Sequence, residues 1–102
     1  METPKIPLPE DVPKLPPGMF YRVARDRAST VPFYWVEVRE PGKWMSREVR
    51  AVRVHAESGG VVRALREACE RAAAEAWELA KLRANWRELD KYVGDHGREA
   101  AK

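Results

Sequence analysis

Few side chains in this sequence are of the types that carry out catalysis or bind metal ions. His55 and His96 have no second histidine, cysteine or carboxylate at the spacing that a metal site needs. Asp95 and His96 are neighbours in a glycine-flanked tail, where nothing fixes their geometry. The sequence has no glycine-rich phosphate loop, nucleophile elbow or helical His-Glu metal motif. We therefore expect no enzymatic activity, no catalytic residue, no metal, no cofactor and no small-molecule substrate.

The single cysteine, Cys69, excludes an internal disulfide bond. It lies on an apolar helical stripe, where a cysteine ordinarily serves as a small buried hydrophobic residue. The sequence has no run of about 18 apolar residues that would form a transmembrane helix, and its N-terminus lacks the pattern of a signal peptide. These observations predict a cytoplasmic protein without membrane contact.

Arginine and aromatic residues are interspersed in the middle of the chain, a pattern typical of surfaces that bind nucleic acid. Residues 18–55 carry eight Arg or Lys against four acids, whereas residues 56–93 carry seven of each. Aromatic rings can stack on bases, and arginines can contact phosphates. The expected nucleic-acid-binding residues are Arg22, Phe33, Trp35, Arg39, Arg47, Arg50 and Arg53.

Three segments have the features of β-strands. Met19–Arg25 and Pro32–Glu40 are dense in apolar and aromatic residues with the two-residue period of a strand. In the second segment, Tyr34, Val36 and Val38 would face the core, and the residues between them would face outward. The third strand runs from about Trp44 or Ser46 to His55, and its mixed faces leave its register open.

A long helix is predicted from Ser58 to about Val93. This stretch has no proline, and its apolar residues recur at intervals of three and four. Ser58 suits an N-cap, although Gly59 and Gly60 indicate that the regular helix begins nearer Val61. At ~1.5 Å per residue the helix would be about 50 Å long. Its alanine-rich first half can lie close to bulky strand residues such as Tyr21, Val23, Tyr34, Val36 and Val38.

The second half of this helix would extend past a sheet of ordinary size and expose an apolar stripe. Such a stripe seldom stays in water. It could be covered if the chain folds back at Asn85, if the N-terminal arm packs on it, or if it pairs with a second chain. The expected partner-binding residues, for a homodimer or a larger protein, are Leu79, Leu82, Trp86, Leu89 and Val93.

Residues 1–17 contain six prolines and form an extended arm rather than a helix or a central strand. The arm could be a loose tail, dock in a groove or cover outward aromatic residues. Residues 94–102 form a flexible tail. Between them, residues 18–93 form one β-β-β-α domain. The predicted fold is α+β, a three-stranded antiparallel meander packed on one long C-terminal helix and preceded by the extended arm.

The order of elements over residues 19–80 resembles that of the plant ethylene-response DNA-binding domain and of the arm-binding domains of tyrosine recombinases. Those domains insert their sheet into the major groove. The resemblance concerns element order, so no residue role is carried over. Our first hypothesis is a small nucleic-acid-binding or regulatory module. The alternative is a protein-interaction factor, such as a phage-type or accessory regulator, that binds a larger protein through helix and arm without contacting nucleic acid.

Overall fold

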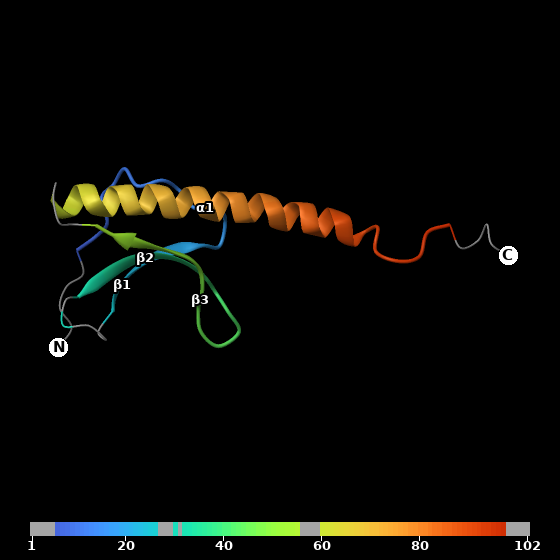
Figure 1. The fold of residues 1–102 in the computed structure, drawn as a ribbon, viewed down its shortest axis with the longest axis horizontal. Coiled ribbons are helices and arrows are strands. Elements are labelled where there is room, and N and C mark those ends of the chain that lie inside the picture. The colour runs from blue at the N-terminus through green and yellow to red at the C-terminus, as the bar shows by residue number, and fades with distance from the viewer. Residues whose placement is uncertain (1–5, 27–29, 31, 56–59, 98–102) are drawn as a thin grey trace.

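The computed structural model describes residues 6–26, 30, 32–55 and 60–97. Its elements, in chain order, are β1 (Phe20–Asp26), β2 (Phe33–Glu40), β3 (Arg47–Val54) and α1 (Val61–Asp90). The strands form an antiparallel sheet in the order β1-β2-β3, and α1 lies along one face of it (Figure 1). The predicted α+β architecture is therefore confirmed.

The third strand begins later than the earliest predicted start. Trp44 and Met45 belong to the loop between β2 and β3, where their side chains are 89% and 78% exposed. Gly42 shapes this loop, because a Cβ atom at that position would collide with the carbonyl oxygen of Met45. The loop therefore presents a tryptophan and a methionine to solvent at the end of the sheet.

A β-bulge interrupts the pairing of β2 with β3 between Val38 and Arg39. The bulge adds one residue to β3 and changes which of its side chains face the helix. Directly paired residues of antiparallel strands point to the same face of a sheet. The register therefore places Arg53 on the face turned away from α1, and Arg47 and Arg50 on the side of α1.

The hydrophobic core lies between α1 and the strands beneath it. Val36 and Val38 of β2 are completely buried, and Val52 of β3 is 6% exposed. Small side chains allow the helix backbone to approach these valines closely. The predicted packing of a small-residue helix face on larger strand residues is confirmed, and the buried residues of α1 are Ala64, Ala68, Cys69, Ala72, Ala73 and Ala76.

The helix lies over β2 and β3 and leaves part of β1 uncovered. Val23 of β1 points to the side of α1 but is 45% exposed, and Tyr34 of β2 is 41% exposed. The expectation that both residues are part of the core was therefore wrong. The reason is the lateral position of α1, which alternation within a strand does not reveal.

The proline-rich arm packs on the helix side of the sheet. Leu8, Val12 and Leu15 contact the core cluster. The hydroxyl group of Tyr21 donates a hydrogen bond to the carbonyl oxygen of Pro13 at 2.6 Å. Docking, one of the predicted alternatives for the arm, is therefore observed for residues 6–17. Residues 8–15 of the arm lie beside α1, on its side of the sheet.

The regular helix begins at Val61, as the two glycines before it indicated, but it ends earlier than predicted. Its N-cap is Gly60, with φ of 87° and no side-chain hydrogen bond to the cap, while the predicted cap Ser58 lies outside the described residues. α1 ends at Asp90 rather than near Val93. The backbone N–H of Val93 donates to the carbonyl oxygen of Asp90, a bond of the tighter i to i+3 type that often closes a helix.

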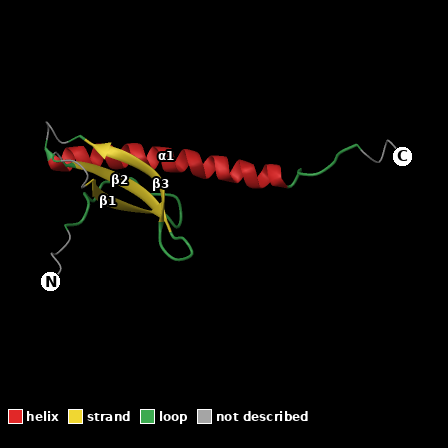
Figure 2. Ribbon diagram, turned by 60° about the horizontal axis from the view of Figure 1, so that its bottom comes forward, coloured by secondary structure: helices red, strands yellow, loops and turns green. Residues whose placement is uncertain are grey.

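The second half of α1 extends well beyond the sheet (Figures 1 and 2). The molecule measures 69 × 29 × 26 Å, and its radius of gyration is 19.5 Å. A compact domain of this size would have a radius of gyration of about 13 Å. The predicted overhang is therefore present. Among the described residues, no helix is both long and apolar enough to cross a membrane.

Candidate interaction surfaces

The face of the sheet turned away from α1, called the outer face below, combines aromatic and arginine side chains. Trp35 of β2 lies between Ala24 of β1 and Arg53 of β3. The guanidinium group of Arg53 lies 4.0 Å from the centroid of the Phe33 ring, which is a cation–π contact. The sheet register brings together on this face Arg22, Phe33, Trp35, Arg39 and Arg53.

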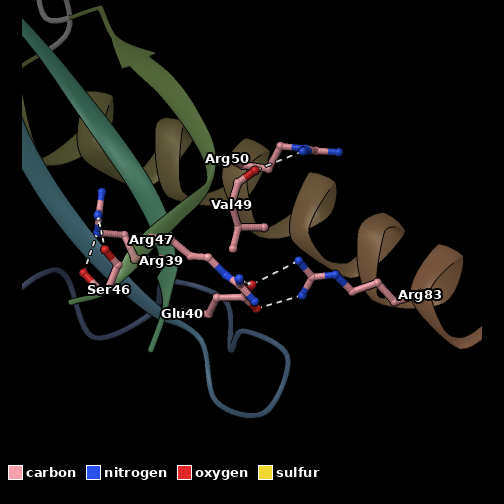
Figure 3. Close-up of polar contacts among 7 residues, drawn as sticks. All are labelled: Arg39, Glu40, Ser46, Arg47, Val49, Arg50 and Arg83. Atoms are coloured by element: carbon pink, nitrogen blue, oxygen red, sulfur yellow. Dashed lines mark hydrogen bonds and ion pairs between the residues drawn. The ribbon is translucent and has the colours of Figure 1, made fainter. Parts of the chain in front are cut away.

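The guanidinium group of Arg39 is held by bonds within the chain. Its Nη1 donates to a carboxylate oxygen of Glu37 at 2.7 Å. Its Nε and Nη2 donate to the hydroxyl and the carbonyl oxygen of Ser46, each at 2.8 Å (Figure 3). The side chains of Arg39 and Glu37 are both only 14% exposed. Arg39 therefore offers little of its charge to a partner.

The charges on the outer face balance. The sheet register places three arginines and three acids on it, namely Arg22, Arg39 and Arg53 against Asp26, Glu37 and Glu48. The positive excess of residues 18–55 is thus not concentrated on this face. An electrostatic attraction for phosphates depends on such a concentration.

Two of the predicted nucleic-acid contacts, Arg47 and Arg50, lie on the other side of the sheet. The Nε atom of Arg47 donates to Glu40 at 2.8 Å. The Nε atom of Arg50 lies 3.8 Å from a carboxylate oxygen of Glu75 in α1. Regular alternation along β3 places Arg50 on the opposite face from Arg53, and the bulge between Arg50 and Glu48 brings Arg47 to the same side as Arg50.

A bidentate ion pair joins the helix to the end of β2. Arg83 of α1 donates to both carboxylate oxygens of Glu40, at 2.7 and 3.1 Å (Figure 3). The hydrogen bond from Arg83 is the main cause that lowers the pKa of Glu40; burial opposes the shift, and Arg47 adds to it. The side chain of Glu40 is 13% exposed. Sequence reasoning missed this pair, although Glu40 continues the alternation that places Val36 and Val38 under the helix.

The predicted partner-binding residues of α1 lie on one side of the projecting half. This is the side of α1 that faces β3, as the ion pair of Glu75 with Arg50 of β3 shows. Leu82, Trp86 and Leu89 follow Glu75 by 7, 11 and 14 residues, each close to a whole number of helical turns. They are 44%, 51% and 61% exposed. We call the following residues the projecting stripe: Leu79, Leu82, Trp86, Leu89 and Val93.

The two ends of the projecting stripe differ in environment. Leu79 is partly buried, since it follows the last fully buried residue of the helix, Ala76. Val93 lies beyond the end of α1 and is 78% exposed. The exposed apolar surface is therefore concentrated between Leu82 and Val93.

Neither the arm nor a bend in the helix covers the stripe. The arm lies on the opposite side of α1, where the indole N–H of Trp77 donates to the carbonyl oxygen of Lys14 at 2.9 Å. Arg66 pairs on the same side with Asp11 of the arm at 2.9 Å. The helix continues without interruption through Asn85. Within the part of the chain that the structure describes, the stripe therefore stays uncovered.

A groove of about 790 Å³ runs between the arm and β1, and the prediction did not include it. Its signal in the sequence was the set of apolar residues between the prolines of the arm. The groove is lined by Ile6, Leu8, Phe20, Tyr21, Arg22 and Val23.

Across residues 6–26, 30, 32–55 and 60–97, no group of three or more histidine, cysteine or acidic side chains is placed to hold a metal ion.

The thiol of Cys69 is buried, and the side chain of Tyr21 is half-buried. Burial, with a smaller effect of Glu70, raises the pKa of Cys69 to about 11. Burial, with a smaller effect of Cys69, raises the pKa of Tyr21 to about 12. A thiol with a raised pKa is a poor nucleophile at neutral pH. These groups therefore act in packing and in fixing the arm.

Comparison of the sequence with protein-family models, and comparison of the chain with curated proteins and with solved structures, finds no significant match.

Proposed function

We propose that this protein is a non-enzymatic protein-interaction module that works through the projecting stripe. The sheet, the arm and the first half of α1 form a base, and the second half of α1 carries the stripe away from it. The single observation that supports this proposal best is the exposure of Leu82, Trp86 and Leu89 on one side of a helix that has already passed the sheet.

The energetic argument favours the stripe over the outer face. Full burial of a large apolar side chain contributes about 1.5–3 kcal/mol. Leu82, Trp86 and Leu89 retain about half of their surface, so covering them contributes roughly 1 kcal/mol each on that scale. The outer face has balanced charges, and its most exposed aromatic residue, Phe20, is 42% exposed. Of these two surfaces, the stripe therefore gains more from a partner.

The test replaces two leucines of the stripe with charged residues. In the Leu82→Glu/Leu89→Glu variant, association should be lost while the fold is kept, since neither side chain belongs to the core. Ala84→Glu, an exposed position on the opposite side of α1, is the matched control. The readout is chemical cross-linking in the cells that make the protein, followed by mass analysis of the complexes.

Two outcomes decide the proposal. Complexes formed by the wild type and by Ala84→Glu but not by the double variant would support it. Complexes that form equally with all three proteins would contradict it. Circular dichroism melting curves of the purified proteins check that the double variant is folded.

Nucleic-acid binding at the outer face is a second candidate. The observation that favours it is the stacking of Arg53 on Phe33 beside Trp35, since stacked arginine and aromatic groups also bind bases. On this hypothesis the contact set narrows to Arg22, Phe33, Trp35 and Arg53. Fluorescence anisotropy with single-stranded and duplex oligonucleotides at low salt tests it. Binding that Trp35→Ala abolishes would support this candidate, and no binding would remove it.

A further inference from the structure

We infer that the partner of the projecting stripe is a second copy of this chain, bound antiparallel. In this dimer the projecting halves of two α1 helices overlap, Trp86 packs beside Leu89 of the second copy, and the two sheets lie at opposite ends. The inference rests on the proposed function and specifies the partner of that surface. Spacing, charge and the position of the sheet each support it.

The spacing of the stripe suits an identical helix. Its members are separated by 3, 4, 3 and 4 residues, which is the seven-residue repeat of paired helices. In an antiparallel pair of helices, the a positions of one helix pack beside the d positions of the other. Trp86 is at an a position and Leu89 at a d position, so Trp86 of each copy can pack beside Leu89 of the other copy. The same contact occurs twice, as two-fold symmetry requires.

Charges beside the stripe complement each other in this register. Arg83 and Asp90 are seven residues apart, so both flank the stripe on the same side. When Trp86 lies beside Leu89 of the second copy, Arg83 of one chain faces Asp90 of the other, and the reciprocal pair forms as well. Within the described residues Asp90 has no ion pair in its own chain. Arg83 binds Glu40 through its Nη1 and Nη2 atoms. Its Nε atom takes no part in these two bonds and is the donor that can face Asp90 of the second copy.

The position of the sheet favours the antiparallel orientation over the parallel one. The stripe continues along the side of α1 where Arg50 of β3 lies beside Glu75. Two parallel copies would bring two β3 strands and two such ion pairs against each other at the same level. In the antiparallel pair, only the projecting halves overlap. The overlap is short, about three helical turns, so we expect a reversible dimer that dissociates on dilution.

Sedimentation velocity of the full-length protein tests whether the partner is a second copy. From about 1 to 200 µM, we expect the wild type and Ala84→Glu to pass from monomer to dimer within this range, the span of weak to moderate self-association. Leu82→Glu/Leu89→Glu should remain monomeric throughout. A wild type that is monomeric at every concentration would overturn the inference. The proposed function would still stand if the cross-linked complexes depend on the stripe.

Disulfide trapping tests the orientation. Trp86→Cys and Leu89→Cys proteins, which differ in mass, are mixed and oxidised, while buried Cys69 stays unreactive. An antiparallel pair gives mainly the mixed disulfide between the two variants. A parallel pair gives disulfides between identical chains, and this result would overturn the inference. Ala84→Cys, on the opposite side of α1, should form neither.

Discussion

Arg39 and Arg53 both lie on the outer face, but their surroundings give them different roles. Arg39 is bound on three of its nitrogen atoms by Glu37 and Ser46. Arg53 stacks on Phe33, and its Nε atom is buried without a hydrogen-bond partner among the described residues. Residue type alone therefore overstated the number of arginines that could contact a ligand. Glu40 is also held on both carboxylate oxygens, because it binds two arginines.

We predict that Glu40→Gln destabilises the protein by about 1–2 kcal/mol at neutral pH, because charge-assisted hydrogen bonds are lost. The pKa of Glu40 is lowered from its ordinary value of 4.5 in the folded state. Its contribution is therefore present above that value and is lost as the pH falls through the lowered pKa. The difference in unfolding temperature between wild type and variant should shrink from pH 7 to pH 3.

The control for this measurement is Glu67→Gln. Glu67 pairs with Arg63 on the exposed face of α1, where the two side chains are 62% and 72% exposed, and such pairs contribute little. Its unfolding temperature should stay close to that of the wild type. A Glu40→Gln difference that is the same at both pH values would show that the ion pair does not stabilise the fold.

At the scale of elements, α1 is one continuous helix with two environments. Its first half packs small side chains against Val36 and Val38. Its second half has passed the sheet, and its apolar side chains face the side of β3 rather than the core. The helix remains regular across this change because no glycine or proline interrupts it. One element thus both completes the core and carries the candidate interaction surface.

The close approach of α1 to the sheet gives a prediction for its alanines. Ala72→Leu should destabilise the protein by about 1–3 kcal/mol, because the larger side chain overpacks a site without free space. Ala74→Leu should be nearly neutral, since Ala74 is exposed two positions further along the helix. Urea unfolding monitored by circular dichroism measures both. Equal stability of the two variants would contradict the close packing.

The whole molecule is elongated because a short sheet supports a helix of 30 residues. Two surfaces result, the outer face at the base and the stripe on the projection. The arm adds a third feature, since it ties β1 to the flank of α1 through Tyr21 and Trp77. Stability should therefore be concentrated at the base and fall along the projection.

Hydrogen exchange should show this gradient. At a protein concentration low enough to keep chains apart, amides of residues 84–90 should exchange at least ~10-fold faster than those of residues 68–76, because only the latter are covered by the sheet. Raising the concentration should slow exchange in 84–90 if the stripe pairs with a second copy. Mass spectrometry of peptides from both segments measures the effect. Uniform exchange along α1 would contradict the division of the helix.

The sequence by itself determined the elements, because their signals are local. Periods of two and of three to four residues identify strands and helix, and the prolines identify the arm. The small side chains from Cys69 to Ala76 indicated which half of the helix meets the sheet. The stripe beyond Leu79 indicated the overhang.

Only the tertiary structure decided how these elements share their surfaces. The bulge opposite Val38 and Arg39 moved Arg47 to the helix side. An insertion of one residue in a strand has no sequence signal in a chain with mixed faces. The lateral position of α1 exposed Val23 and left room for the arm. The pair of Glu40 with Arg83 joins positions 43 residues apart. Such long-range contacts depend on the packing of whole elements, which no local pattern specifies.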